Sequence, residues 1–270
     1  MKISGAIGSC AIGLNLIHTV YSFAIQSPNA AQSFSPNSKD SSGSLATDHD
    51  KTVVKPRAIF CGDRSQPTIF TPGDDPNVDG PGVLLRDLDY TNTHKPHFYF
   101  LYENGQDEHP WKYTLLQPGA EVFVSVCPTF AGRIVRGDPT YNLNRTLQTN
   151  LGTWIELSWE GPPTRKSWGD VSLLEGYDGA ALLIPTDGSG VFTGFTKDIL
   201  MGAPSSALAY KADGGVALAK TVGDGANLIA QAYELALLNP MTEAFILEAY
   251  KPVVLSSNGR WDLTLYPGTY

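Results

Sequence analysis

Three carboxylates lie close together in the segment WGDVSLLEGYDG, residues 168–179: Asp170, Glu175 and Asp178. Polar and apolar residues alternate from Asp170 onward, which is typical of a strand with one face in the core, and the segment ends in a glycine-containing turn. Acidic residues at such a turn are commonly only solvated. Crowded carboxylates can also bind or hydrolyse a sugar, because they shift one another's pKa values so that one donates a proton while another is an anion. The segment alone leaves both interpretations open.

Other patterns that could carry chemistry are weak. Residues 75–80, DPNVDG, have the oxygen-ligand spacing that opens a calcium loop, but Arg86 stands where a bidentate glutamate is required, so a surface turn is the simpler interpretation. His94 and His97 have no obvious third metal ligand and are interpreted as surface histidines beside a strand. The common nucleophile, phosphate-loop and zinc-protease motifs are missing from the sequence. We therefore predict neither a metal site nor a cofactor.

The first part of the chain has the pattern of a secretory leader. Lys2 precedes a mostly apolar stretch, and the small residues Ser22 and Ala24 suit signal peptidase, which predicts a signal peptide over residues 1–24. Residues 25–55 are rich in polar residues and proline and are predicted to be a disordered linker or a pro-segment. We expect a secreted protein, extracellular or in a cell wall, with no membrane association. Asn144 begins the sequon for N-glycosylation.

Charge and cysteine content limit the partners and the fold. The net charge of −8 and the pI near 5.0 argue against nucleic acid, whereas a neutral polysaccharide is indifferent to that sign. Cys61 and Cys127 are the only cysteines beyond the predicted signal, and the sequence leaves open whether they form a disulfide. Because two cysteines cannot form a disulfide scaffold, an apolar core must stabilise the fold.

Short strand patterns recur between glycine, proline and asparagine clusters, which predicts a mainly β fold, a sandwich or flattened barrel, over residues 56–270. The predicted strands are residues 57–61, 83–88, 97–103, 111–116, 121–127, 132–137, 152–159, 170–176, 179–185, 190–195, 252–257 and 260–266. On the third of them, Phe98, Phe100 and Tyr102 share one face, for which core packing is a simpler interpretation than a sugar-stacking surface.

A helical insertion interrupts the strand pattern at about residues 186–250. Residues 224–238 carry Leu228, Ala232, Leu235 and Ala236 at helical spacing, which predicts an amphipathic helix packed on the β domain. Asn239 and Pro240 then have the pattern of a helix start, so a second short helix is predicted to reach about Ala249.

Five segments resemble, in the same order, segments of thaumatin-like proteins. They are HKPHFYFLYENG, LLQPGAEVFVSVCPTFAGRIVRG, TWIELSW, WGDVSLLEGYDG and EAFILEAYKPVVLSSNGRWDLTLYPGTY, and the resemblance covers residues 92–185 and 240–270. The chain departs from that family in its two predicted mature cysteines and in residues 186–239, which do not match the family's disulfide-rich second domain. It looks like a cysteine-depleted, secreted member of fungal type.

The resemblance implies an acidic cleft that binds β-1,3-glucan, with weak endo-glucanase activity in some members. Residue by residue, it places Arg133, Glu156, Asp170 and Glu175 in that cleft, with Glu175 longer than the usual aspartate, and Glu243 as the counterpart of a fifth acid. We take Glu156, Asp170 and Glu175 as candidate catalytic residues and Arg133, Asp178 and Glu243 as candidate substrate-binding residues. Whether the protein is an enzyme stays open.

Two further functions remain compatible with the sequence. The protein could be a non-catalytic adhesin, effector or inhibitor that binds a protein partner through its loops. It could also be a structural wall component tethered by residues 25–55. In each case we expect a monomer.

Overall fold

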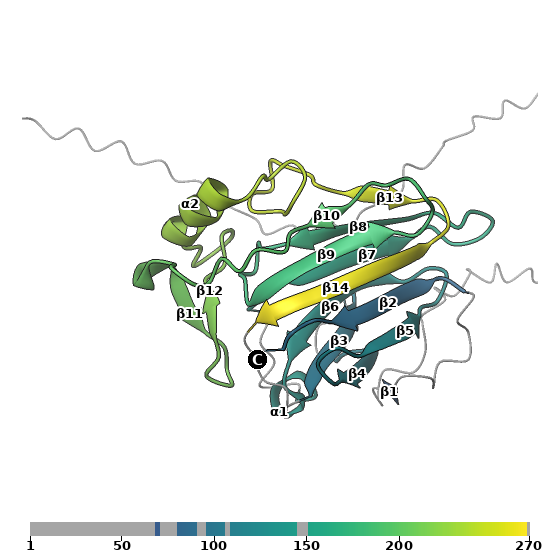
Figure 1. Cartoon of the computed structure of the whole chain (residues 1–270), viewed down its shortest axis with the longest axis horizontal. Coiled ribbons are helices and arrows are strands. Elements are labelled where there is room, and N and C mark those ends of the chain that lie inside the picture. The colour runs from purple at the N-terminus through teal and green to yellow at the C-terminus, as the bar shows by residue number, and fades with distance from the viewer. Residues whose placement is uncertain (1–67, 71–79, 91–95, 106–108, 145–150, 269–270) are drawn as a thin grey trace, which may run out of the picture.

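The computed structural model of the chain describes residues 68–70, 80–90, 96–105, 109–144 and 151–268 (Figure 1). Several predicted features lie outside these residues: the signal peptide at 1–24, the linker or pro-segment at 25–55, the strand at 57–61, Cys61, the calcium-like ligands at 75–79, and His94.

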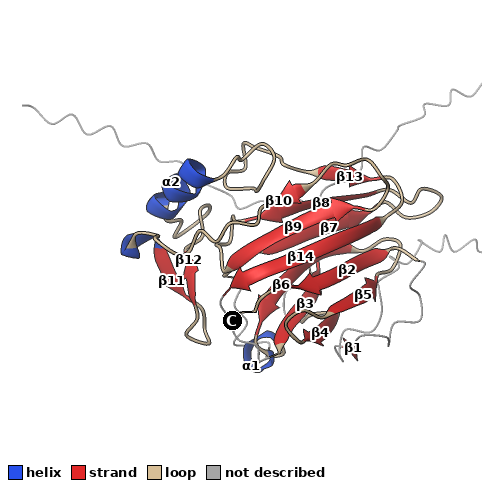
Figure 2. Ribbon diagram, in the orientation of Figure 1, coloured by secondary structure: helices blue, strands red, loops and turns tan. Residues whose placement is uncertain are grey.

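The described residues form two main β-sheets, as the secondary-structure colouring in Figure 2 shows. The larger sheet has the strand order β1 (Thr68–Phe70), β4 (Lys112–Leu116), β3 (His97–Glu103), β6 (Ala131–Gly137), β7 (Trp154–Trp159), β8 (Ser167–Ser172) and β13 (Val254–Ser256). The second sheet has the order β10 (Thr193–Gly194), β9 (Gly179–Pro185), β14 (Arg260–Gly268), β2 (Gly82–Asp87) and β5 (Glu121–Ser125). The fold is thus mainly β and resembles a sandwich without closing into a barrel, which confirms the predicted class.

Alternating residues of the two sheets build one core between them. On β7, Ile155 and Leu157 are buried in this core, and Val171 of the neighbouring β8 joins them. Trp261 of β14 is also buried there, and its indole N–H donates to Ser167 Oγ of β8 at 2.8 Å. Each such apolar side chain contributes about 1.5–3 kcal/mol when fully buried, so the core is the main stabilising element.

The other face of the larger sheet carries a second, smaller apolar cluster. Phe100, Tyr102 and Val135 are buried in it, and Phe98 and Trp154 pack against it. The short helix α1 (Pro139–Asn142) is bonded to this cluster, because the Tyr102 hydroxyl donates to the Asn142 carbonyl at 3.1 Å. The packing predicted for the aromatic face of β3 is confirmed, but that face lies outside the main core.

The β8 region differs slightly from its prediction. The strand begins at Ser167, before the predicted start, and it ends at Ser172. Val171 and Leu173 are buried in the main core, as the alternation predicted. The predicted glycine turn follows, and Gly176 adopts a φ of +110°, which residues other than glycine rarely adopt.

Residues 186–250 do contain a helix and, in addition, a small hairpin. The helix α2 (Leu228–Leu237) begins at Asn227, whose side chain accepts hydrogen bonds from the amides of the first turn. Besides β10, which lies within the predicted strand at 190–195, this region contains η1 (Ser205–Ala207) and the two-stranded sheet of β11 (Leu208–Tyr210) and β12 (Val216–Leu218), none of which the sequence pattern predicted. They lie beside α2 at one end of the sandwich (Figure 1).

The predicted second helix at 239–249 is wrong. Residues 240–243 form a turn, and Phe245 then forms an isolated bridge with Ser172 at the end of β8. The Phe245 amide donates to the Val171 carbonyl at 2.9 Å, and the Leu173 amide donates to the Phe245 carbonyl at 2.8 Å. Pairing with a sheet end uses the backbone groups that a helix would need for itself.

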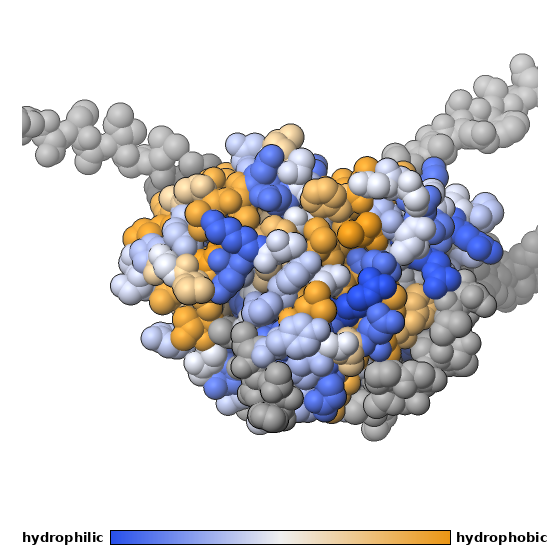
Figure 3. Space-filling view, viewed as in Figure 1, coloured by the Kyte–Doolittle hydropathy of each residue, from blue (hydrophilic) through white to orange (hydrophobic). Residues whose placement is uncertain are grey.

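The predicted orientation of α2 is also wrong. Of the stripe predicted to pack on the β domain, Leu228, Ala232 and Ala236 are exposed and Leu235 packs against the main core, while Glu234 is fully buried. The polar ends of the helix explain this rotation, because Asn227 donates to the Ser206 carbonyl at 2.7 Å and Gln231 to the Thr221 carbonyl at 2.9 Å. Figure 3 shows the resulting apolar surface at the end of the molecule where α2 lies.

Candidate functional site

Arg133, Glu156 and Asp170 lie side by side across three neighbouring strands. Arg133 of β6 pairs with Glu156 of β7, and Glu156 pairs with Asp170 of β8. Directly opposed residues on one sheet face have Cβ atoms about 4.5–5.5 Å apart, so the three side chains form one continuous charged row. The row lies on the outer face of the larger sheet, because Ile155 and Val171, which alternate with it, point into the main core.

The guanidinium of Arg133 is held by aromatic rings. Its central carbon lies 4.1 Å from the ring centroid of Trp154 and 4.8 Å from that of Tyr102, the residue opposite Arg133 on β3. Only 3% of Arg133 is exposed, so this cation has little contact with solvent. Ring faces and the neighbouring Glu156 provide the negative potential that a buried cation needs.

The two acids of the charged row differ in their access to solvent. Glu156 is half-buried, and burial raises its pKa, while a hydrogen bond with Ser172 and the charge of Arg133 lower it. Asp170 is 2% exposed, and burial, followed by the charge of Glu156, raises its pKa well above the usual range. No described residue hydrogen-bonds to Asp170 Oδ1. The row therefore combines a carboxyl that strongly retains its proton with a second carboxylate and a fixed cation.

Two tryptophans flank Glu156 on the same sheet face. Trp154 precedes Glu156 by two residues on β7, and Trp168 precedes Asp170 by two residues on β8. Both are half-buried, so part of each indole is accessible. The sequence analysis did not include them as site residues, although their spacing of two from the predicted acids was a signal that strand periodicity offers.

Glu175 joins the charged row from the turn after β8. It is half-buried, and its charge raises the pKa of Glu156, which places its carboxylate within electrostatic range of the row. The structure thus brings together Arg133, Glu156, Asp170 and Glu175, which the sequence analysis took from three separate segments.

Asp178 and Glu243 have other partners. Asp178 is buried and forms an ion pair with Lys211 at 2.7 Å, and its second oxygen accepts from the Thr153 amide at 3.0 Å. The Glu243 carboxylate accepts a hydrogen bond from the Asn239 amide within the turn after α2. These contacts give both acids a structural role.

The remaining predicted residues are placed as follows. Asn144 is exposed just after α1, while the rest of its sequon lies outside the described residues. Cys127 is disulfide-bonded, and Cys61, the other cysteine beyond the predicted signal peptide, lies outside the described residues. His97 is not at the surface as predicted, because its Nδ1 lies 2.7 Å from Asp87 Oδ2 and both side chains are buried.

Within the part of the chain that the structure describes, no group of three histidine, cysteine or acidic side chains could hold a metal ion. None of the described helices has the length and apolarity to cross a membrane. Comparison with protein-family models gives no match, and neither does comparison with curated proteins.

Proposed function

We propose that this is a secreted, thaumatin-like protein that binds the β-1,3-glucan of a cell wall at the charged row. The observation that carries the proposal is the register of β6, β7 and β8. Arg133, Glu156 and Asp170 were assigned separately from the family resemblance, and they are direct cross-strand neighbours. Unrelated charged residues would have no reason to fall on one sheet face and in one register.

The surroundings of the charged row suit a neutral sugar. Trp154 and Trp168 present part of their indoles on either side of Glu156, and the apolar face of a pyranose packs well on such rings. The carboxylates of Glu156 and Glu175 are half-buried and can accept hydrogen bonds from sugar hydroxyls. Arg133 keeps the local charge from becoming strongly negative.

Binding is better supported than hydrolysis. A general acid must reach the glycosidic oxygen, but Asp170, whose pKa is raised most strongly in the row, is 2% exposed. Glu156 and Glu175 are accessible, yet Glu175 is one methylene longer than the acid it replaces in the resemblance, and a misplacement of ~1 Å can cost ~100-fold in rate. We therefore infer a binding protein with at most weak glucanase activity.

The exposed face of α2 favours a second candidate function, a non-catalytic protein that binds a protein partner. Leu228 is 70% exposed and Ile229 is 49% exposed, and Met241 just beyond the helix is 61% exposed. Large apolar side chains grouped at the surface are typical of interaction sites. In this alternative the charged row has no ligand.

Retention on insoluble β-1,3-glucan, together with release of reducing sugar, tests the proposal. We expect wild type to be retained, Glu156→Gln and Trp168→Ala to lose about tenfold or more in affinity, and Glu248→Gln, at an exposed position away from the row, to behave as wild type. Retention that neither row variant weakens would remove the row from the function. Wild type that is not retained at all would favour the protein-partner alternative.

A further inference from the structure

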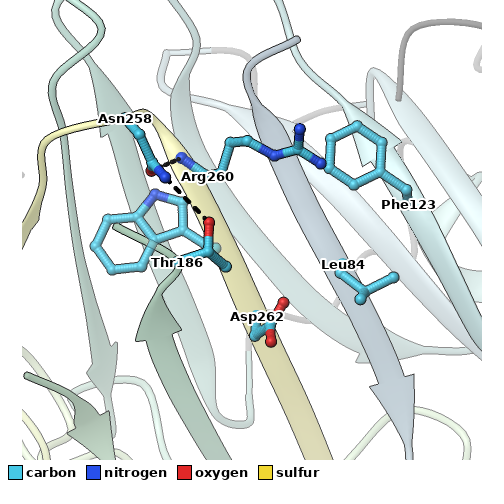
Figure 4. A pocket seen from close by; sticks show the side chains of 7 residues that line it. Leu84, Phe123, Thr186, Asn258, Arg260 and Asp262 are labelled. Carbon is cyan, nitrogen blue, oxygen red and sulfur yellow. Dashed lines mark hydrogen bonds between the residues drawn. The ribbon is translucent and has the colours of Figure 1, made fainter. Parts of the chain in front are cut away.

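A pocket lies on the opposite side of the sandwich from the charged row, on the outer face of the five-stranded sheet. It has a volume of about 440 Å³ and is lined by Leu84, Phe123, Thr186, Asn258, Arg260, Trp261 and Asp262 (Figure 4). These residues come from β2, β5, β14 and the turns at the ends of β9 and β14. None of them belongs to the charged row, so the pocket is a separate feature of the molecule.

The pocket has an apolar floor between two polar groups with unused hydrogen-bonding capacity. Leu84 and Phe123 are directly opposed on β2 and β5 and form the floor. The Arg260 guanidinium lies 4.9 Å from the Phe123 ring centroid and makes no hydrogen bond or ion pair with any described residue. Asp262 Oδ2 accepts from Arg86 at 3.1 Å, whereas Asp262 Oδ1 accepts nothing from the described residues. A free donor and a free acceptor thus face one concavity.

The strand β14 places Arg260 and Asp262 on the same side of the sheet. Arg260 and Asp262 alternate on β14 and so share its outer face, with their Cα atoms about 6.6 Å apart along an extended strand. A ring of sugar size placed on Leu84 can therefore present hydroxyls to both ends. A sugar offers both donors and acceptors at its edge and apolar C–H groups on its face, which is the pattern that this pocket complements.

The side-chain amide of Asn258 lies at the rim of the pocket, and its orientation is fixed by hydrogen bonds within the protein. Its Oδ1 accepts from the Arg260 amide at 2.9 Å and from Ser256 Oγ at 2.8 Å, and its Nδ2 donates to Thr186 Oγ1 at 3.2 Å (Figure 4). A side chain with fixed orientation loses less conformational entropy on binding than a mobile one.

The charges of the lining residues and of their ion-pair partners cancel, and the carboxylate of Asp187, next to Thr186, is hydrogen-bonded to Ser257. Arg86 and Arg260 provide two positive charges, and Glu121 and Asp262, both paired with Arg86, provide two negative charges. A uronate or sulfated sugar would gain nothing from this balance, and the net charge of −8 for the whole chain would disfavour it. A cationic ligand would likewise find no excess of carboxylate. The balance fits an uncharged ligand.

We propose that this pocket is a binding site for one neutral hexopyranose unit of an oligosaccharide. Leu84 supports the apolar face of the ring, Arg260, stacked on Phe123, donates to its oxygens, and Asp262 Oδ1 accepts from a hydroxyl. This site does not include any residue of the charged row. The proposal of a sugar site here can therefore be tested separately from the glucan-binding function proposed above.

Isothermal titration of the Glu156→Gln/Trp168→Ala double variant tests the proposal, because these two changes are expected to weaken sugar binding at the charged row. The probes are neutral hexasaccharides of glucose, mannose and galactose, with a galacturonate hexasaccharide as the charged comparison. We expect at least one neutral probe to bind at millimolar concentration, and additional Arg260→Ala or Asp262→Ala to weaken it by about tenfold.

Glu121→Ala is the matched control, because it also removes a partner of Arg86 but does not line the pocket. It should leave the affinity within about twofold of the background. Three results would overturn the proposal: no neutral probe binding at that concentration, binding of galacturonate alone, or neutral binding that neither Arg260→Ala nor Asp262→Ala weakens. Failure of the glucan retention test alone would leave this pocket intact.

Discussion

Glu156 and Asp170 face each other directly across β7 and β8, on the sheet face that points away from the main core. Burial raises the pKa of both carboxyls, and each lies in the field of another acid: Asp170 in that of Glu156, and Glu156 in that of Glu175. Arg133 opposes this effect at Glu156 alone. The burial of this pair consequently destabilises the folded state, and the apolar core offsets that cost. Replacing either acid should therefore change the measured stability.

The first prediction concerns the pH dependence of stability at Asp170. The pKa of Asp170 in the folded protein is raised above the unfolded value near 3.9. Its contribution to the free energy of unfolding is therefore fully present below that pH and is lost as the pH rises through the folded pKa. Asp170→Asn has no ionisable group at this position and does not lose stability in this way. In urea denaturation, we expect the variant to gain stability over wild type progressively as the pH rises above about 4.

Asp224→Asn, at an exposed position, is the control and should show no such trend. If the difference between Asp170→Asn and wild type is the same at all pH values, the buried, protonated state of Asp170 is disproved.

The second prediction concerns Arg133. Arg133→Met removes the stacked cation and leaves Glu156 without the charge that lowers its pKa, so we expect a loss of about 2–4 kcal/mol in the free energy of unfolding at neutral pH. Arg133→Lys should lose less, since it retains the charge but not the planar guanidinium. Arg165→Met, at an exposed arginine, controls for the substitution itself. Equal stability of Arg133→Met and wild type would contradict the role of the stacked cation.

The third prediction concerns the buried ion pair of Lys211 and Asp178, which ties the small hairpin to the turn before β9. Lys211→Met leaves the Asp178 charge buried and should destabilise the protein by about 3–5 kcal/mol. The double variant Lys211→Met/Asp178→Leu should recover part of this loss, though not all, because Thr153 loses the acceptor for its amide. A double-mutant cycle by chemical denaturation measures the coupling.

The exposed pair of Arg86 and Glu121 provides the comparison for that cycle, since Glu121→Ala should cost less than about 1 kcal/mol. A coupling energy for the buried pair no larger than that of the exposed pair would show that Lys211 and Asp178 are not held as the structure describes.

The fourth prediction concerns Glu234 of α2. Neither carboxylate oxygen has a hydrogen-bond partner among the described residues, and burial raises the pKa of Glu234 to about 9. The stability that the raised pKa provides is fully present below the unfolded pKa near 4.3. Between that pH and pH 9, the free energy of unfolding falls by up to about 1.4 kcal/mol per pH unit. Glu234→Met should remove that slope and stabilise the protein at neutral pH by about 1–3 kcal/mol.

Thermal unfolding of Glu234→Met beside wild type across this pH range provides the measurement. Glu248→Met replaces an exposed glutamate and should retain the wild-type slope. If Glu234→Met is destabilising at every pH, the carboxyl has a favourable interaction that outweighs its burial.

Much of the β framework could be predicted from the sequence because strand periodicity is a local signal. The short runs of apolar and aromatic residues at 97–103 and 179–185, each bounded by turn residues, predicted β3 and β9 with their observed bounds. The pairing of Arg133, Glu156 and Asp170 could not be derived in this way. Register between strands far apart in sequence depends on which residues meet in the core, and a single sequence does not contain that information.

The errors around α2 have a common physical cause. Leu228, Ala232 and Ala236 have the spacing of a buried helix face, but side-chain hydrogen bonds from Asn227 and Gln231 to distant carbonyls orient the helix differently. The helix predicted after Asn239 failed because Phe245 found a partner at the end of β8. In both cases a tertiary contact outweighed a correct local pattern.

The register that aligns the charged row also decides which residues of β7 and β8 are inside. Deleting one residue from β7 would turn Ile155 and Leu157 outward and bring Glu156 into the sandwich, so a change in the register of this strand would disrupt the core. Insertions and deletions are therefore tolerated in the loops and not within the strand. What occupies the outward positions is free to drift, and a descendant with an identical scaffold could therefore replace every ionisable group on this face and still fold.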